Sequence, residues 1–256
     1  MGNRGPAGAV YIIASAPMSR FSRRFAVLCL CAIASACGPG ACLFGEQPPA
    51  QDTTTGQPAA RVDPSAPPAR PRVVALGDSL TAGYGLLEQQ AYPALLQKKV
   101  DQDGYAFEVV NAGVSGDTSA GGLRRLDWAL EGNVRVLILA LGANDGLRGL
   151  PIAEMKENLG AIIDRAREKN VVVILAGMEA PPNYGPEYVQ SFRMAYSSLA
   201  ASKRVLFVPF LLDKVAGVGT LNQGDGIHPN EQGAQIVADT LWPVVRNVLD
   251  QMAGTQ

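Results

Sequence analysis

The feature that most constrains this chain is a strict alternation of short apolar runs and helical stretches that begins at Arg72. The apolar runs cover residues 73–76, 107–110, 134–141, 171–176 and 205–208, and the helical stretches lie around residues 92–100, 119–130, 152–169, 187–201 and 231–249. Near-continuous apolarity is typical of strands buried on both faces of a parallel sheet. The alternation therefore predicts an α/β protein, a three-layer α/β/α sandwich with a mostly parallel five-stranded sheet.

The first 36 residues carry the pattern of a secretory signal. Three arginines between residues 20 and 24 supply a positive start, and residues 25–33 form an apolar stretch too short to anchor the chain across a bilayer. Residues 34–36, Ala-Ser-Ala, supply the small side chains that precede a cleavage site. We therefore predict a signal peptide over residues 1–36, with Met18 as the plausible true start, and export to the periplasm.

Cys37 directly follows this segment and resembles the cysteine of a bacterial lipobox, which is lipidated and becomes the mature N-terminus. A lipobox prefers a large aliphatic residue where Ala34 stands, so ordinary cleavage that releases a soluble protein is the alternative. Residues 37–70 are rich in Pro, Ala, Gln, Thr and Gly, a composition that predicts a disordered tether. The folded domain is predicted to span residues 71–252. A lipid on Cys37 would associate that domain with a membrane.

Composition excludes several classes of function. His228 is the only histidine, and all four cysteines lie within the first 42 residues. The domain therefore lacks the imidazoles and thiolates of most zinc, iron and iron–sulfur sites. The net charge of −1 gives no indication of a nucleic-acid partner. We predict no metal, no cofactor and no nucleic acid, and the sequence sets no oligomeric state.

Three of the predicted strands end in short polar turns that contain glycine, at the edge where such sheets bind ligands. Ser79 follows the first strand, exposed on a turn either as the nucleophile of acyl transfer or as a helix N-cap. Gly113 either presents its N–H to a ligand or shapes its turn, and Asn144 either donates its amide or stabilises its turn. Asp78 and Asp145 beside them are assigned turn or helix-start roles.

Asp225 lies three residues before His228 in a glycine-rich segment ahead of the last helix. A carboxylate at this spacing can bond one ring nitrogen and leave the other free to accept a proton from a serine. A lone histidine is usually a surface or core residue. If this is a Ser–His enzyme, however, His228 is the only possible base.

In order and spacing, these pieces closely resemble the four motif blocks of the SGNH (GDSL) hydrolase family, over residues 72–249. The blocks correspond to Ser79, Gly113, Asn144 and His228, with Asp225 completing a triad. Residues 142–150, 181–185 and 225–233 resemble the branch of bacterial acyl-thioesterases, lysophospholipases and arylesterases. Ala143 departs from the second glycine that family members often carry. The resemblance implies a flavodoxin-like SGNH hydrolase fold and a serine ester hydrolase.

The resemblance also implies a role for each motif residue. Ser79 Oγ would attack the acyl carbonyl while His228 accepts its proton, and Asp225 would hold the imidazole in the right tautomer. The backbone N–H groups of Ser79 and Gly113, with the side-chain amide of Asn144, would form the oxyanion hole. Water activated by His228 would then hydrolyse the acyl-enzyme.

Two loops, residues 146–151 and 177–186, leave the predicted carboxyl edge of the sheet and are expected to border Ser79. They carry apolar side chains that would either hold an acyl chain or pack the loops themselves: Leu147, Leu150, Met178, Pro182 and Tyr184. The expected substrates are small-molecule or lipid esters, namely lysophospholipids, aryl esters or acyl thioesters. The alternatives are a carbohydrate or cell-wall O-acetyl esterase of the same family, and a non-catalytic ligand-binding lipoprotein.

Overall fold

The structure is a computed structural model that describes residues 70–254. The predicted signal peptide, the predicted lipidation site Cys37 and all but the last residue of the predicted tether lie outside the described residues. Within the described part of the chain, no helix is long and apolar enough to cross a membrane.

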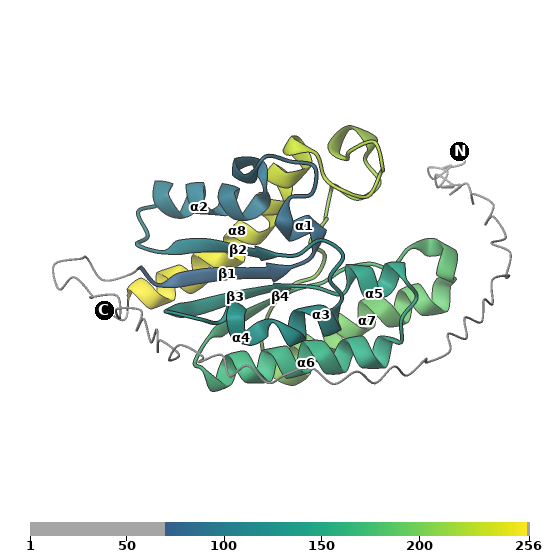
Figure 1. The fold of residues 1–256 in the computed structure, drawn as a ribbon, viewed down its shortest axis with the longest axis horizontal. Coiled ribbons are helices and arrows are strands. Elements are labelled where there is room, and N and C mark those ends of the chain that lie inside the picture. The colour runs from purple at the N-terminus through teal and green to yellow at the C-terminus, as the bar shows by residue number, and fades with distance from the viewer. Residues whose placement is uncertain (1–69, 255–256) are drawn as a thin grey trace, which may run out of the picture. The chain divides into compact units, whose positions relative to one another are not determined.

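Five parallel strands form one sheet in the order β2-β1-β3-β4-β5, which confirms the predicted sheet (Figure 1). The strands are β1 (Arg72–Gly77), β2 (Glu108–Gly113), β3 (Val134–Ala140), β4 (Val172–Ala176) and β5 (Leu206–Val208). Their register sets Gly77 against Gly113 on one side and against Ala140 on the other. The segments that follow β1, β2 and β3 therefore leave the sheet side by side.

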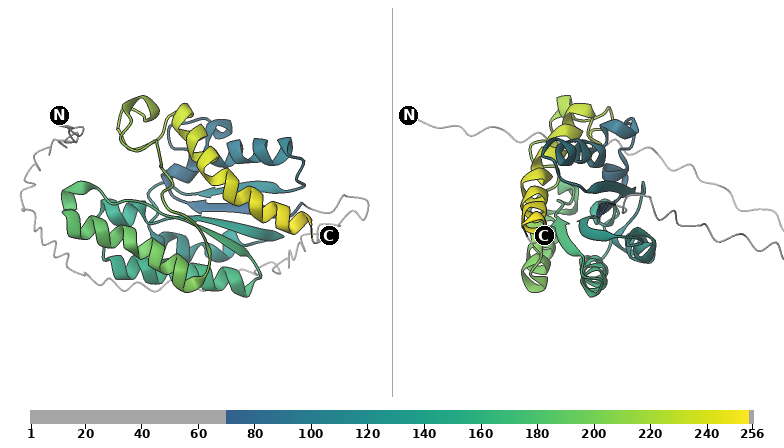
Figure 2. Two further views of the ribbon diagram at one scale, coloured as in Figure 1. Left: turned by 180° about the vertical axis from the view of Figure 1, so that it is seen from behind. Right: turned by 90° about the vertical axis from the view of Figure 1, so that its left-hand side faces the viewer.

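Helices cover both faces of the sheet, which confirms the three-layer sandwich (Figure 2). On one face α2 (Tyr92–Gln102) packs against α8 (Glu231–Ala253). On the other face α6 (Ile152–Glu168) packs between α3 (Ser119–Arg124) and α7 (Pro186–Lys203). The buried side chains of α6 recur at helical spacing and face the sheet: Met155, Leu159, Ile162, Ile163 and Ala166.

One predicted helix, residues 119–130, is wrong as a single element. It is interrupted at Arg125, whose φ of −102° and ψ of 10° separate α3 from α4 (Leu126–Ala129). Two consecutive glycines, Gly121 and Gly122, weaken the helix before the break. The side chain of Arg125 meanwhile makes hydrogen bonds to the sheet, so local propensity and tertiary contacts both favour the interruption.

Short elements connect the strands to the longer helices and are too brief to show a sequence period. They are α1 (Ser79–Ala82), η1 (Glu88–Gln90), α5 (Ala143–Leu147), η2 (Pro182–Tyr184) and η3 (Gly219–Leu221). Two of them, α1 and α5, start directly after β1 and β3. Both therefore lie at the carboxyl edge of the sheet, and they begin with or contain the predicted site residues Ser79 and Asn144.

Gly142 lies between β3 and α5, and a substitution there would show how tightly this edge of the sheet is packed. Its φ is +108°, and an added Cβ would lie 2.1 Å from the Tyr196 hydroxyl, which donates a 2.9 Å hydrogen bond to Leu141 O. We expect Gly142→Ala to lower the free energy of unfolding by about 2–4 kcal/mol, because it adds backbone strain and overpacking. Urea unfolding measures this change. Wild-type stability would contradict the packing described here, and Ala161→Gly on α6 provides a control for an ordinary helix substitution.

Candidate active site

Ser79 is held at the start of α1 by the residue before it. Asp78 is the N-cap of α1, and its Oδ1 accepts a 3.0 Å hydrogen bond from the Leu80 N–H. The predicted helix-start role of Asp78 is thereby confirmed. Because β1 ends at Gly77, Ser79 lies just past the carboxyl edge of the sheet with a half-buried side chain.

His228 lies in the segment between η3 and α8, and main-chain contacts fix that segment. Asn222 and Pro229 form an antiparallel bridge, and the Gln223 N–H donates to His228 O at 2.7 Å. The side-chain amide of Gln223 also donates to Pro229 O at 3.0 Å and to Tyr84 O at 2.6 Å. Gln223 therefore connects the segment that carries His228 to the loop that follows Ser79.

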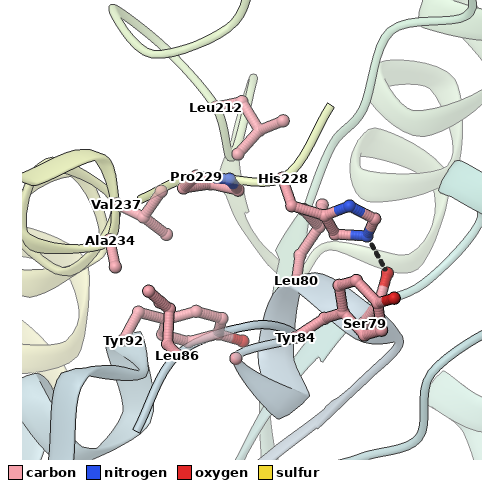
Figure 3. Close-up of a pocket in the computed structure, with 11 residues that line it drawn as sticks. Ser79, Leu80, Tyr84, Leu86, Tyr92, Leu212, His228, Pro229, Ala234 and Val237 are labelled. Carbon is pink, nitrogen blue, oxygen red and sulfur yellow. Dashed lines mark hydrogen bonds between the residues drawn. The ribbon is translucent and has the colours of Figure 1, made fainter. Parts of the chain in front are cut away.

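The structure brings the three predicted triad residues into one hydrogen-bonded chain. Figure 3 shows the bond between Ser79 and His228. His228 Nε2 lies 2.8 Å from Ser79 Oγ, and His228 Nδ1 lies 2.6 Å from Asp225 Oδ2. The Tyr84 ring packs beside the imidazole, with ring centroids 4.8 Å apart. These distances allow proton transfer from the serine to the imidazole.

Hydrogen bonds within its own loop orient the Asp225 carboxyl group and favour its ionised form. Desolvation acts to raise the Asp225 pKa, but the N–H groups of His228 and Ile227 and the His228 ring outweigh it and lower the pKa to about 2. The two N–H groups donate to Asp225 Oδ1 at 3.0 and 2.9 Å, which leaves Oδ2 for the imidazole. Asp225 is therefore an anion at neutral pH and can act only as a hydrogen-bond acceptor for the ring.

Asn144 is positioned beside the loop that follows β2. Its Nδ2 donates to Asp117 O at 2.9 Å and lies 3.4 Å from Asp78 Oδ2, a much weaker contact. The next residue, Asp145, is buried and accepts hydrogen bonds from the N–H and Oγ of Ser119, at 2.8 and 2.6 Å. The backbone around Asn144 is thus fixed, while one of its amide hydrogens has only a weak partner.

The prediction that Gly113 supplies an oxyanion donor is wrong on geometric grounds. The neighbouring Val114 N–H donates to Gly77 O in β1, and N–H directions alternate along a strand. The Gly113 N–H therefore points away from β1, and it donates to Asn111 Oδ1 at 3.0 Å. Gly113 has a packing role instead, because an added Cβ would lie 2.2 Å from the backbone nitrogen of Ala82.

Sequence reasoning missed Gly116, three residues further along the same loop. Within residues 70–254, the structure gives its N–H no hydrogen-bond partner, while its carbonyl accepts from Arg148 Nη2 at 2.8 Å. The adjacent Asp117 carbonyl holds the Asn144 amide. The strand register indicates such a residue. Gly77 pairs with Gly113, and Ser79 lies two residues past Gly77, so a donor level with Ser79 must come from beyond Gly113.

A small apolar cavity adjoins Ser79 and His228 on the side of α8 (Figure 3). Its volume of about 10 Å³ has room for a single water. Apart from Ser79, Gly83, His228 and Pro229, the residues that line it are Leu80, Tyr84, Leu86, Tyr92, Leu212, Ala234 and Val237. They come from α1, α2, α8 and the loops between, not from the two loops that sequence reasoning selected.

The five predicted substrate-contacting residues fall into two groups. Leu147, Leu150, Pro182 and Tyr184 are exposed, and the Tyr184 hydroxyl donates to Leu147 O at 2.9 Å, so the two loops contact each other. Met178 belongs to the hydrophobic core and is 7% exposed. Its prediction as a substrate contact is therefore wrong, because it packs with the core instead of facing the loop surface.

The fold and this site together define a serine hydrolase of the α/β/α type, with a serine hydrogen-bonded to a histidine at the carboxyl edge of a parallel sheet. Comparison with known proteins gives the family. Residues 75–236 match the GDSL-like Lipase/Acylhydrolase family, and the chain belongs to that family. It is a carboxylic ester hydrolase, as the SGNH resemblance implied.

Curated relatives agree with this assignment. The chain is 42% identical to Esterase TesA of Pseudomonas aeruginosa, over 69% of this chain and 89% of that protein. It is 38% identical to thioesterase 1/protease 1/lysophospholipase L1 of Escherichia coli, over 64% and 78% respectively. A solved structure of a relative is that of the psychrotrophic esterase EstA from Pseudoalteromonas sp., inhibited by monoethylphosphonate. It is 34% identical, has a TM-score of 0.67, and the match covers 70% of this chain and 98% of EstA.

Asp78 gives this site a testable pH dependence of stability. Burial raises the Asp78 pKa from 3.8 to about 6, although the Leu80 N–H and His228 oppose the rise. A raised carboxyl pKa means that the folded state disfavours the carboxylate, so stability is lost as pH rises through 6. Asp78→Asn retains an N-cap oxygen but has no carboxyl group to ionise. We expect the free energy of unfolding of this variant, relative to that of the wild type, to be about 2–3 kcal/mol higher at pH 8 than at pH 4.

Urea unfolding of both proteins at the two pH values measures this difference. The exposed Asp213→Asn variant serves as the control and should leave the pH dependence of the wild type unchanged. An equal stability difference at pH 4 and pH 8 would show that the buried carboxyl does not titrate as described.

Proposed function

We propose that Ser79 is the nucleophile, His228 the general base and Asp225 the residue that orients the imidazole. The observation that carries this assignment is the continuous chain of hydrogen bonds, 2.8 Å from Ser79 to His228 and 2.6 Å from His228 to Asp225. A neutral imidazole whose Nδ1–H is held by Asp225 leaves Nε2 as an acceptor for the serine proton.

For the oxyanion hole we propose the N–H of Ser79, the N–H of Gly116 and the weakly bound amide hydrogen of Asn144. Three features support this set: the Ser79 N–H lies at the start of α1, the Gly116 N–H lacks a described partner, and Asn144 is only weakly held at 3.4 Å by Asp78. Preorganised neutral donors of this kind stabilise the negative oxygen that develops during acyl transfer.

The proposed reaction has two steps, formation of an acyl-enzyme on Ser79 and its hydrolysis. Ser79 Oγ adds to the acyl carbonyl while its proton passes to His228 Nε2, and the negative oxygen is stabilised by the three donors. Collapse of this intermediate expels the alcohol or thiol, which takes the proton from His228 and leaves an acyl-serine. Water then adds to that ester with His228 again accepting a proton, and His228 passes this proton to Ser79 Oγ as the acid leaves.

The proposed substrates are esters or thioesters with an apolar acyl group. Support comes from the exposed side chains of Leu147, Leu150 and Tyr184, together with the curated names esterase, thioesterase and lysophospholipase of the relatives. Lysophospholipids and other exported esters suit an exported enzyme better than acyl-CoA. The alternatives are a carbohydrate or cell-wall O-acetyl esterase and a non-catalytic ligand-binding lipoprotein.

A series of p-nitrophenyl esters with acyl chains of two to twelve carbons separates these alternatives. We expect kcat/KM to rise with chain length beyond acetate, because longer chains bury more apolar surface. Leu147→Ser and Leu150→Ser should flatten this rise, whereas the exposed Met194→Ser on α7 should not. Cleavage restricted to acetyl esters would instead support the O-acetyl esterase, and no labelling of Ser79 by a fluorophosphonate would support the non-catalytic protein.

We also propose that the domain is exported and attached to a membrane through a lipid on Cys37. This rests on the sequence pattern of residues 1–37 alone. Mass spectrometry of the mature N-terminus tests it: a diacylated Cys37 is expected, and an unmodified N-terminus after Ala36 would show a soluble protein instead.

The triad assignment predicts how single and double substitutions combine. Ser79→Ala and His228→Ala should each lower kcat by about 10⁴-fold or more, and the double variant should lose little beyond either one, because the two act as a unit. Steady-state hydrolysis of a p-nitrophenyl ester measures this, with the unfolding midpoint as a control for folding. Ready hydrolysis by His228→Ala near neutral pH would overturn the mechanism.

A further inference from the structure

Arg125 lies at the break between α3 and α4, with only 17% of its side chain exposed. Its three nitrogens all donate to oxygens at the carboxyl edge of the sheet. Nη2 donates to Gly77 O at 2.7 Å, Nη1 to Ala112 O at 2.7 Å, and Nε to Asp117 Oδ2 at 2.6 Å. One guanidinium therefore contacts the end of β1, the end of β2 and the loop after β2.

These three contacts lie on the segments that carry the proposed oxyanion donors, within four residues of Ser79 or Gly116. The Gly77 carbonyl precedes Asp78 and Ser79, and the Ala112 carbonyl anchors the strand end from which the loop to Gly116 departs. Asp117 follows Gly116, and its own carbonyl accepts the 2.9 Å hydrogen bond from the Asn144 amide. The segments that bear the donors are thus connected to each other through one side chain.

The chemistry of arginine suits this position. The guanidinium has five N–H donors in a rigid planar fork, so it can fix three acceptors in set directions at once. Charge-assisted hydrogen bonds of this length in a partly buried setting are short and strong. A lysine could supply the charge but not the fixed geometry.

We propose that Arg125 is a positioning residue for the oxyanion hole, holding the peptides of Ser79 and Gly116 and the amide of Asn144 at the spacing that the transition state requires. This inference rests on the proposed oxyanion hole. In this role Arg125 affects how well the developing negative oxygen is bound in the transition state. A purely structural residue would instead affect substrate binding or the stability of the fold.

The test compares Arg125→Gln and Arg125→Lys with a matched control, Arg165→Gln. Arg165 also pairs with an aspartate, at 2.6 Å to Asp127, but its side chain is 40% exposed and, among residues 70–254, has no hydrogen bond to a strand end. We expect Arg125→Gln to lower kcat by about 10²-fold with KM changed less than about threefold. Arg125→Lys should recover only part of that loss, and Arg165→Gln should match the wild type.

Three further readouts separate positioning from loss of structure. A boronic acid forms a tetrahedral adduct with an active serine, so its affinity should fall in parallel with kcat, since tetrahedral adducts mimic the transition state. Guanidinium ion at millimolar concentration should restore part of the kcat of Arg125→Ala. In combination with Asn144→Ala, which alone should cost about 10²–10³-fold, Arg125→Gln should add less than its single effect.

Three results would each overturn the proposal: an unchanged kcat in folded Arg125→Gln, boronate affinity equal to that of the wild type, or losses in the double variant that multiply fully. A failure of the proposed function is distinguishable from all of these. In that case the wild-type enzyme itself would show no boronate inhibition, and Ser79→Ala would retain activity.

Discussion

The site depends on the register of three parallel strands. Because Gly77 pairs with Gly113 and with Ala140, the segments after β1, β2 and β3 leave the sheet together. The first carries Ser79, the second the loop with Gly116, and the third Asn144. The proposed base comes from a different part of the chain: the His228 segment is folded back by the Asn222–Pro229 bridge and connected to the Ser79 loop through Gln223. The proposed catalytic residues therefore come from the ends of the strands and from one loop that these contacts hold in place.

Buried polar groups around this edge restrict its geometry further. Asp78 is 1% exposed and caps α1, while Asp145 is 3% exposed and accepts hydrogen bonds from Ser119, the first residue of α3. Burying carboxyl groups costs stability, which the raised pKa of Asp78 reflects. Hydrogen bonds from Leu80 to Asp78 and from Ser119 to Asp145 offset part of that cost, and those of Arg125 hold the ends of β1 and β2. Rigidity of this kind is what an oxyanion hole requires.

The sequence was sufficient for the sheet and the longer helices, because near-continuous apolar runs alternate with helical stretches. Its motifs also pointed to the three residues that the structure joins by hydrogen bonds, Ser79, His228 and Asp225, whose catalytic roles are proposed above. It was insufficient where tertiary contacts decide. The break at Arg125 follows from hydrogen bonds to strands distant in sequence, and Met178 is buried by packing that loop composition does not reveal. Choosing between Gly113 and Gly116 required the direction of an N–H, which only the pairing of β2 with β1 determines.

The central claim is that three donors converge on the oxygen of an acyl group attached to Ser79. A crystal structure of the enzyme after reaction with an alkyl phosphonate inhibitor tests it most directly, because the phosphoryl oxygen occupies the position of the oxyanion. We predict this oxygen within about 2.7–3.1 Å of the Ser79 N–H nitrogen, the Gly116 N–H nitrogen and Asn144 Nδ2. An adduct on another residue, or an oxygen bound by Gly113 with Gly116 turned away, would contradict the account.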